Sequence, residues 1–453
     1  MEGNLTKGPI LKTLTKLAIP IMASSFLGTL YNLTDMAWIG LLGSKAVAGV
    51  GVGGMYTWLS QGLASMARMG GQVQVAQCIG KGNRDEANKY AQTAVQLATL
   101  MGLVYAAIVL LFLHRLVGFF HLDDAEAIAA ALSYTRIACG LIVFSFLTFT
   151  LTGIYTAQGD SKTPFIANLI GLVINMILDP VLILGPGPLP ELGVAGAAIA
   201  TVTAQGIVMS VMIIGIFVQK KDNVLKGIRL FARIPMEYVS GICKIGIPTA
   251  LQGMAYCVIS MVLARMVSVF GAEAVAVQRV GGQIESLSWN TADGFAAALN
   301  AFVGQNYGAN KMDRVKKGYR ASLWTVGIWG LITAIFVFVP KPIARIFFHE
   351  ATAIEIAVDY LIIVGLSEAF MCVELMTVGA LSGLGKTHLC SVISIIFTGA
   401  RIPLAILLCR TALGLNGIWC AVSSTSIVKG IIFVATFFWI TRSSRILKNN
   451  SRL

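Results

Sequence analysis

Charged residues are scarce in this sequence. Aspartate, glutamate, lysine and arginine together make up 12% of its 453 residues, about half of the share that soluble domains carry. With 56% hydrophobic residues and a mean hydropathy of +0.79, this scarcity excludes a soluble globular protein. Apolar runs of about 20 residues, each long enough to cross a bilayer, recur along the chain. We therefore predict an all-α integral membrane protein surrounded by the lipid bilayer.

Acidic residues are outnumbered by basic ones, which gives a formal net charge of +13. A basic balance can indicate a nucleic-acid partner, but here the lysines and arginines lie in short loops between apolar runs. Such loops report membrane topology, so we expect no nucleic acid. The basic loops and both tails fall on one side, which predicts that both termini are cytoplasmic in a multi-pass protein.

Histidine and paired cysteine are also lacking. The four histidines have no metal-ligand spacing, and the eight cysteines mostly lie within apolar runs without paired spacing. This excludes a disulfide framework and a zinc site. We also find no nucleophile with a base and no paired metal ligands at one depth, so an intramembrane enzyme is not supported. The expected protein is not an enzyme and has no cofactor apart from a coupling ion.

The apolar runs predict twelve transmembrane helices, and some exceed the length needed to cross the bilayer, which indicates tilt. The predicted spans are 14–40, 46–78, 91–118, 125–158, 164–186, 193–219, 238–270, 274–306, 318–348, 352–384, 387–411 and 415–440.

The two halves of the chain repeat each other. Lys16-x-x-Ile19-Pro20 recurs as Lys244-x-x-Ile247-Pro248, 228 residues later, and Gly43-x-x-Ala46-Val47-Ala48 recurs at Gly271 with the same offset. Near the end of each half, Leu192-Gly193-x-x-Gly196 recurs at Leu413, with an offset of 221. Six spans per half place both copies in the same orientation, as in transporters built from parallel repeats. The repeat predicts an N-terminal lobe (1–219), a cytoplasmic connector (220–237) and a C-terminal lobe (238–453).

Two acids in the first half lie where an ionisable group is costly. Asp179 stands four residues after Asn175 in an apolar run, so a helix stacks the two side chains one turn apart. Asp35 lies in the first run, with Asn32 on its own face. The competing interpretation of Asp179 is a structural group at the kink beside Pro180.

A rise of about 1.5 Å per residue places further polar groups at the same depth. Asp35 and Thr201 each lie about 12 Å from the outer end of their spans, and Tyr134 lies about 13 Å into its own span. Carboxylate, amide and hydroxyl oxygens suit a hard cation or a shared proton. We therefore predict a cation-coupling site, with possible Na⁺ ligands at Asp35, Asn175, Asp179 and Thr201, and with Asn32 and Tyr134 beside them.

The second half contains intramembrane charges of both signs, for which ion pairs between helices are the favoured interpretation. They are Glu285, Glu368, Glu374, Arg401 and Lys429. Pro20 lies on the same predicted helix as Asp35, and it removes a backbone donor and allows a bend. We hypothesise that Pro20 is a hinge and that protonation of Asp35 changes the bend of this helix.

With these residues placed, the chain resembles the multidrug and toxic compound extrusion (MATE) family of transporters. The motifs that carry the resemblance are Gly153-Ile154-Tyr155-Thr156-Ala157-Gln158-Gly159-Asp160-Ser161-Lys162-Thr163-Pro164, Asn175 to Pro180, Gly193 to Thr201, and Gln305-Asn306-Tyr307-Gly308-Ala309. The resemblance implies two six-helix lobes around a V-shaped cavity and the export of cationic, amphipathic compounds in exchange for H⁺ or Na⁺. It also implies a cation site at the positions of Asp35, Tyr134, Asn175, Asp179 and Thr201. We expect a monomer in the plasma membrane of a prokaryote, the cell inner membrane.

The resemblance is incomplete in the second half. Other branches of the family carry an acid in helix seven and another in helix ten, whereas helix seven here offers Gln252 and Tyr256. Glu368 and Glu374 of helix ten are not clearly in register, so the site in the first half is favoured. The alternative function is a flippase for lipid-linked precursors of the same superfamily. Such flippases often have fourteen spans and an arginine-rich cavity, unlike this sequence. The sequence does not distinguish H⁺ from Na⁺ or name the substrate.

Overall fold

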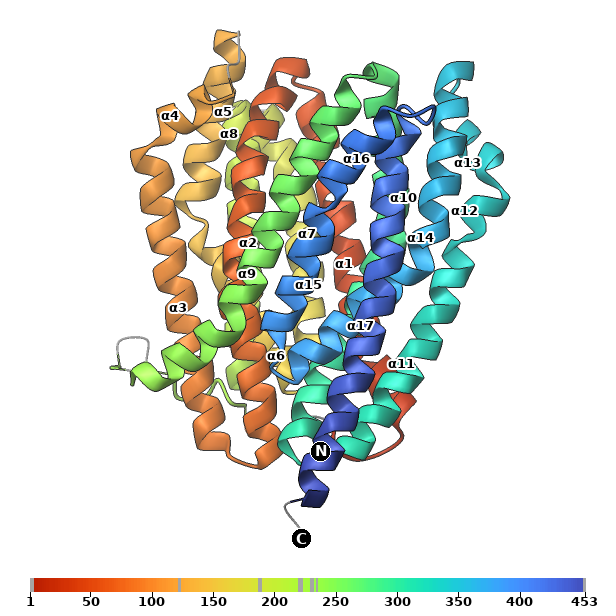
Figure 1. Ribbon diagram of the computed structural model, residues 1–453. Helices are drawn as coiled ribbons and strands as arrows, with labels where there is room; N and C mark the ends of the chain where they lie inside the picture. Colours follow the sequence, from red (N-terminus) through yellow and green to blue (C-terminus); the bar gives the residue numbers. More distant parts are fainter. Residues whose placement is uncertain are drawn as a thin grey trace. The chain divides into compact units, whose positions relative to one another are not determined.

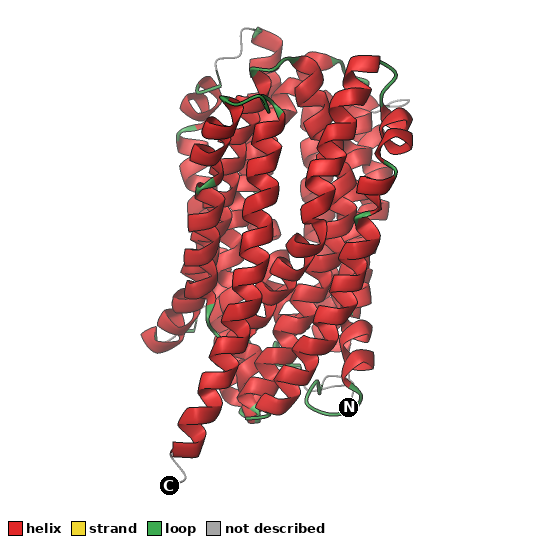
Figure 2. Cartoon of the chain, turned by 45° about the vertical axis from the view of Figure 1, so that its right-hand side comes forward, coloured by secondary structure: helices red, strands yellow, loops and turns green. Residues whose placement is uncertain are grey.

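The computed structural model describes residues 4–120, 124–185, 190–218, 223–228, 232–233 and 235–450. Each regular element in these ranges is a helix (Figure 2). The chain divides into two compact units, which we describe separately. Unit 1 is built mainly from Ala23–Ala250, and unit 2 from Leu5–Met22 together with Leu251 and the residues after it.

The division into units differs from the predicted lobes. The unit boundaries fall inside helices, two residues after Pro20 and two residues after Pro248. The first part of each proline-containing helix therefore packs with the half of the sequence to which it does not belong. Of the predicted connector 220–237, only residues 223–228, 232–233 and 235–237 are described, and the others lie outside the described residues.

Unit 1 is a bundle in which α2 packs against α3, α5 and α6, while α7 packs along α8 (Figure 1). Two helices, α1 (Ile10–Gly40) and α9 (Met236–Ser268), belong partly to each unit. The helices that lie wholly within unit 1 are α2 (Ser44–Lys81), α3 (Arg84–Leu111), α4 (Leu113–Gly118), α5 (Ala125–Gly140), α6 (Val143–Ala157), α7 (Lys162–Leu184) and α8 (Gly193–Val218).

Unit 2 is organised around α14, which packs against α10, α11 and α17 (Figure 1). Its helices are α10 (Ala272–Gly308), α11 (Met312–Thr333), α12 (Ile335–Phe338), α13 (Pro340–Phe347), α14 (Ala351–Gly383), α15 (Thr387–Gly399), α16 (Arg401–Cys409) and α17 (Asn416–Asn450). Each of the twelve predicted spans coincides with one helix or with two or three consecutive helices.

Eight of the described helical segments are long and apolar enough to cross a membrane, or nine if the bent pair α5–α6 forms one span. They define a multi-pass membrane protein. The helices α2 and α10, with 38 and 37 residues, are longer still but less apolar, and α11 is also less apolar. Because a helix surrounded by other helices can direct polar side chains toward its neighbours, it need not be apolar on every side.

Some spans are interrupted where the sequence cannot continue a straight helix. The pair α5–α6 bends by 46° after Gly140. The helices α15 and α16 are separated at Ala400 because the ring of Pro403 clashes with the carbonyl four residues before it, that of Gly399. Pro340 begins α13 at a position where its missing N–H costs no hydrogen bond.

The sequence repeat is visible in the backbone. Gly43 before α2 has φ 100° and ψ 171°, and Gly271 before α10 has φ 106° and ψ 172°. Gly193 and Gly414, the second predicted pair, also share a positive φ, of 53° and 49°. Only glycine adopts such angles readily. The repeated glycines therefore mark corresponding turns in the two halves.

A short segment before α1, residues 5–8, is held by the end of α10 and the start of α11; we call it the N-terminal strap. The Leu5 amide donates to Gln305 Oε1 at 2.9 Å, and Asn306 Nδ2 donates to the Leu5 carbonyl at 3.2 Å. Leu5 is 4% exposed and shares an apolar cluster with Phe437 of α17. Leu5 therefore anchors this segment in the apolar core of unit 2.

Arg314 makes the largest contribution to this docking. Its Nη1 donates to the Gly8 carbonyl at 2.8 Å, and its Nη2 donates to the carbonyls of Lys7 at 2.9 Å and Leu5 at 3.4 Å. Hydrogen bonds from a charged donor contribute about 1.5–3 kcal/mol. We expect Arg314→Ala to accelerate amide hydrogen exchange in the N-terminal strap by about tenfold or more, as measured by mass spectrometry.

The matched control for this prediction is Lys311→Ala, because Lys311 Nζ donates a single hydrogen bond to the strap, to the Thr6 carbonyl at 2.9 Å. Its effect on exchange is expected to be smaller. Equal exchange rates in the wild type and in Arg314→Ala would show that the guanidinium does not hold the strap.

Candidate functional site

The predicted pairing of Asn175 with Asp179 is present on α7. Asn175 Nδ2 donates to Asp179 Oδ1 at 3.0 Å, and both side chains are completely buried. Asp179 Oδ2 and Asn175 Oδ1 remain without a hydrogen-bond partner among the described residues. Because buried polar atoms are nearly always satisfied, these two oxygens are available to bind a ligand.

The second predicted acid, Asp35, is buried on α1 within unit 1. Its side chain is 7% exposed, and Oδ1 has no hydrogen-bond partner in the described chain. Asp179 lies within electrostatic reach of Asp35. No ion pair to a described basic residue neutralises either carboxylate. Within the described residues, the two acids therefore form a buried acidic centre without a basic partner.

Hydroxyl groups from three helices surround these carboxylates. The Tyr31 hydroxyl on α1 is buried and has Thr201, Asp35, Tyr134 and Asp179 as its polar neighbours. Tyr134 on α5 is 6% exposed and has the same acids and Thr201 as neighbours. Thr201 Oγ1 on α8 is also buried without a partner in the described residues. The predicted residues Tyr134 and Thr201 thus join the two acids.

An apolar cluster shows that these polar groups share one level. Asp35 and Asp179 each lie four residues before a member of this cluster, and Thr201 lies four residues after one, on the oppositely running helix α8. The cluster consists of Ile39, Ala46, Val50, Tyr134, Ala138, Ile183, Ala197 and Ala198. Since four residues are about one helical turn, the three polar side chains lie one turn below a common apolar layer.

Asn32 is the predicted site residue that does not join the cluster, because its side chain is exposed. Tyr31, and not Asn32, lies beside Asp35 in the cluster. Residues 31, 35 and 39 follow each other at one-turn spacing along the buried side of α1, and residue 32 turns away from it. Tyr31 and Asn32 both lie about one turn before Asp35, so the sequence spacing alone allows either of them. Pro20 lies inside the continuous helix α1, in the part that belongs to unit 2.

Gly53 on α2 makes room for the tyrosine of the site. A Cβ atom at this position would lie 2.5 Å from Tyr134 Cδ1 and 2.9 Å from Thr135 Oγ1. Any larger residue would therefore displace the Tyr134 ring. Where α2 and α5 begin, Lys45 pairs with Asp124 at 2.8 Å and with Glu126 at 2.9 Å. The Lys45 ammonium, followed by the backbone amide of Glu126, lowers the pKa of Asp124.

The donor set defines what the site can do. Two carboxylates, an amide oxygen and a threonine hydroxyl are oxygen ligands, the kind that a hard cation prefers. Asp35, Asn175, Asp179 and Thr201 could hold Na⁺, and either carboxylate could take up a proton. The described residues contain no group of three or more histidine, cysteine, aspartate or glutamate side chains that could hold a metal ion.

The predicted ion pairing in unit 2 is confirmed for one pair. Lys429 Nζ on α17 lies 2.7 Å from Glu374 Oε1 on α14, and both side chains are nearly buried. Arg401 instead donates to the Thr425 hydroxyl at 3.1 Å and to the Ser426 hydroxyl at 2.9 Å. The remaining acids, Glu285 and Glu368, form no salt bridge in the described chain, so ion pairing does not account for them.

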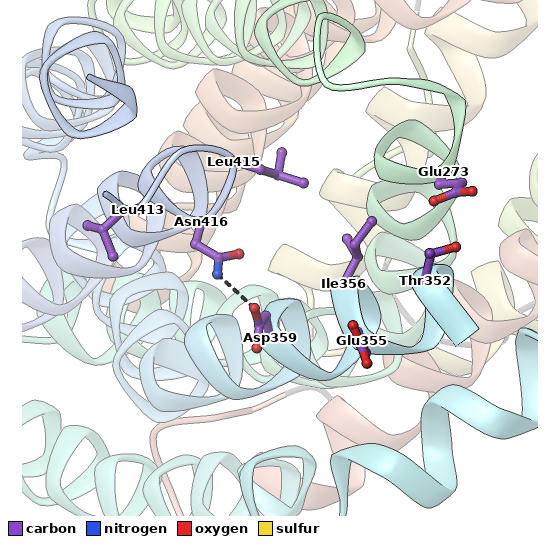
Figure 3. A pocket seen from close by; sticks show the side chains of 8 residues that line it. All are labelled: Glu273, Thr352, Glu355, Ile356, Asp359, Leu413, Leu415 and Asn416. Atoms are coloured by element: carbon purple, nitrogen blue, oxygen red, sulfur yellow. Dashed lines mark hydrogen bonds between the residues drawn. The ribbon is translucent and has the colours of Figure 1, made fainter. Parts of the chain in front are cut away.

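An open pocket of about 400 Å³ lies elsewhere in unit 2, where α10, α14 and α17 begin (Figure 3). Asn416 Nδ2 donates to Asp359 Oδ2 across its wall at 2.8 Å. The residues that line it are Glu273, Thr352, Glu355, Ile356, Asp359, Leu413, Leu415 and Asn416. Its acidic side chains are on an open surface, in contrast to the buried carboxylates of unit 1.

A multi-pass helical protein with an internal repeat and a buried acidic centre belongs to the class of secondary transporters. Comparison with known proteins identifies the family within this class. The sequence profile of the MatE family matches residues 20–181 and again residues 248–407, which together form more than half of the chain. The chain therefore belongs to the MATE family, whose members are transporters and not enzymes.

Individual relatives agree with this assignment. The chain is 31% identical over 439 residues to "Probable multidrug resistance protein NorM" of Thermotoga maritima, covering 94% of this chain and 91% of the relative. It is 26% identical to "Probable multidrug resistance protein YoeA" of Bacillus subtilis, covering 98% and 96%. A solved outward-facing MATE transporter of the MOP superfamily has the same fold, with a TM-score of 0.89 over 98% of each chain at 22% identity.

Proposed function

We propose that this protein is an antiporter that exports cationic, amphipathic compounds in exchange for H⁺ or Na⁺ by alternating access. The observation that carries the proposal is the pair of buried acids in unit 1, Asp35 and Asp179, with unpartnered oxygens and no described counter-ion. Intramembrane acids of this kind are functional sites by default. The names of the two sequence relatives, both multidrug resistance proteins, agree with such a substrate.

The two acids explain how a cation and a substrate can exclude each other. When H⁺ or Na⁺ enters from outside and binds between Asp35 and Asp179, it neutralises the negative centre and removes the attraction for a positively charged substrate, which is released. When the cation leaves toward the cytoplasm, the negative centre is restored and binds the next substrate. The Asn175 amide holds Asp179 in place during both steps.

The driving force is sufficient for this exchange. One H⁺ provides about 1.4 kcal/mol per pH unit, and any monovalent cation provides about 2.3 kcal/mol per 100 mV of membrane potential. Exchange of one such cation for one substrate of charge +1 moves no net charge, so only the concentration gradient of the ion drives it, and a tenfold substrate gradient costs about 1.4 kcal/mol. A single coupling ion can therefore drive export.

Transport in proteoliposomes tests the proposal and identifies the ion. The purified protein is reconstituted, and tetraphenylphosphonium movement is followed while a sodium gradient or a pH gradient is imposed separately. We expect one of the two gradients to drive accumulation against the substrate gradient. Failure of both gradients, applied singly and together, to drive any accumulation would rule out cation-coupled antiport of this substrate class.

The cytoplasmic location of both termini is part of the proposal. The contact between Leu5 and the cluster that contains Phe437 supports a common side for the two ends. The basic loops between the spans support the cytoplasm as that side. We place the protein in the plasma membrane of a prokaryote, in agreement with the bacterial sequence relatives.

Pro20 is proposed as the hinge of α1. The boundary between the two units crosses α1 two residues after Pro20, so the parts of this helix on the two sides of the boundary pack in different units. Alanine would restore the backbone donor and stiffen the helix. We expect Pro20→Ala to lower tetraphenylphosphonium transport by about tenfold while substrate binding is retained.

Pro248→Ala is the matched control for this hinge. Pro248 occupies the corresponding place in α9, and the residue of α9 that corresponds to Asp35 at the repeat offset of 228 is Leu263, which carries no charge. Its effect on transport is expected to be clearly smaller. Normal transport by Pro20→Ala would contradict the hinge.

A further inference from the structure

Near its start, α11 has an exposed basic side. Lys317 and Arg320 are exposed, whereas Val315 and Tyr319 on the other side of the helix are buried in the core of unit 2. Neither basic side chain forms a salt bridge with a described residue. Trp324, one turn after Arg320, is 75% exposed. This side of α11 therefore combines positive charges with a large, exposed indole ring.

The last part of α17 has the same two kinds of side chain in the reverse order. Trp439 is 70% exposed, and Arg442, three residues later, is also exposed and forms no salt bridge within the described chain. The helix α11 leads away from this end of unit 2 and α17 leads back to it (Figure 1). Each helix therefore places its arginine nearer to this end of the unit than its tryptophan.

Aromatic rings hold the two helices together at this level. The Tyr319 ring of α11 stacks on Phe437 of α17 with centroids 3.6 Å apart, and it meets Phe438 edge-on at 5.7 Å. Arg320 directly follows Tyr319, and Arg442 lies one turn after Phe438. Because each residue of a helix advances about 1.5 Å, the two arginine positions differ by about 8 Å in depth. The aromatic rings therefore lie between the two arginines.

The corresponding side of the helix in unit 1 binds another part of the chain. At the repeat offset of 228, Lys316 and Trp324 of α11 correspond to Asn88 and Gln96 of α3. Asn88 Nδ2 donates to a carbonyl of the connector at 2.6 Å, and Gln96 Nε2 donates to another at 3.1 Å. Neutral amides thus bind the connector in unit 1, whereas unit 2 has a cation and an indole at the same two positions.

The C-terminal part of the chain offers no anion for this surface. The sequence after Glu374 contains no aspartate or glutamate, and the residues after Arg442 include three more basic ones. The helix α11 contains a single acid, Asp313, which lies one turn before Lys317 and toward the start of the helix. The C-terminal tail is therefore repelled by the basic side of α11, and a negatively charged molecule from outside the chain is attracted.

We propose that α11 and α17 form a binding site for an anionic phospholipid of the surrounding bilayer. Arg320 and Arg442 bind the phosphate group, because a guanidinium donates parallel hydrogen bonds to phosphate oxygens and its long stem lets it reach along the helix. Lys317 adds a positive charge beside them. The indoles of Trp324 and Trp439 pack beside the lipid where headgroup and acyl chain meet, the level that tryptophan prefers in membranes. The topology proposed above places this lipid in the cytoplasmic leaflet.

Native mass spectrometry of the purified full-length protein tests this site. Delipidated protein in detergent is titrated with dioleoyl phosphatidylglycerol, and the wild type is compared with the double variant Arg320→Gln with Arg442→Gln. Each basic residue near an anionic lipid surface contributes about fivefold in affinity, so we expect the variant to bind about 25-fold more weakly. Both positions are exposed, so the variant should fold normally.

The matched control is the double variant Lys81→Gln with Lys89→Gln, which removes two exposed cations from unit 1. We expect it to bind phosphatidylglycerol like the wild type, and we expect the wild type to bind zwitterionic phosphatidylcholine more weakly than phosphatidylglycerol. This pattern would support a lipid site on α11 and α17.

Equal affinity of the wild type and the arginine variant would overturn the proposal. An equal loss of affinity in the lysine control would also overturn it, because the attraction would then be diffuse. If glycerol phosphate binds as tightly as phosphatidylglycerol, the ligand is a soluble phosphate and the lipid site is refuted. None of these measurements involves transport, so their outcome is independent of the proposed antiport.

Discussion

Asp179→Asn is expected to abolish cation-driven export, reducing tetraphenylphosphonium transport by at least about a hundredfold. Asparagine is nearly the same size, and its Oδ1 can still accept the hydrogen bond that Asn175 Nδ2 donates at 3.0 Å in the native protein. Folding and membrane insertion should therefore be preserved. What is lost is the charge, because an amide cannot alternate between a negative and a neutralised form. Asp35→Asn is expected to have the same effect.

Asn32→Ala is the matched control for both substitutions. Asn32 is on the same helix as Asp35 but is exposed, so we expect its replacement to leave most of the transport intact. Transport is measured in proteoliposomes with equal amounts of folded protein, as judged by size-exclusion chromatography. Near-normal export by either aspartate variant would contradict the proposed coupling site.

Lys429→Met is expected to destabilise the protein by about 3–5 kcal/mol, the cost of leaving one member of a buried ion pair without its partner. Lys429 Nζ lies 2.7 Å from Glu374 Oε1, and the two side chains are 5% and 9% exposed. The unpaired Glu374 carboxylate would have to remain in a low-dielectric interior or take up a proton. Thermal unfolding in detergent should show a clearly lower transition temperature.

The double variant Glu374→Met with Lys429→Met separates the cost of an unpaired charge from the value of the pair. Replacing a whole buried ion pair by apolar residues is often nearly neutral. We therefore expect the double variant to recover most of the stability lost in the single one. Equal stability of Lys429→Met and the wild type would show that the pair does not stabilise unit 2.

The twelve spans and the repeat were predictable from the sequence because hydrophobicity and turn glycines are local properties. Gly43 and Gly271 recur with nearly identical backbone angles, as their spacing indicated. The pairing of Asn175 with Asp179 was also predictable, because two residues that are four positions apart on a helix are neighbours on its surface. Each of these features is determined within a single helix or turn and not by contacts between helices.

Features that depend on packing between helices could not be predicted from the sequence. The choice between Asn32 and Tyr31 depends on which side of α1 faces α5, α7 and α8, and an apolar helix gives little indication of that side. The unit boundaries after Pro20 and Pro248 depend on contacts made by helix segments far apart in sequence. Tertiary structure also decides that Glu374 forms a salt bridge with Lys429, whereas the Glu368 carboxylate has no hydrogen-bond partner among the described residues.

The displacement of the coupling cation by substrate tests the central claim most directly. Purified protein in detergent is loaded with ²²Na⁺ or held in weakly buffered solution with a pH indicator, and tetraphenylphosphonium is then added. We predict that the wild type releases the cation when substrate is added. The double variant Asp35→Asn with Asp179→Asn should remain folded but should not release the cation that the site in unit 1 holds in the wild type. Cation release by the double variant equal to that of the wild type would contradict the account.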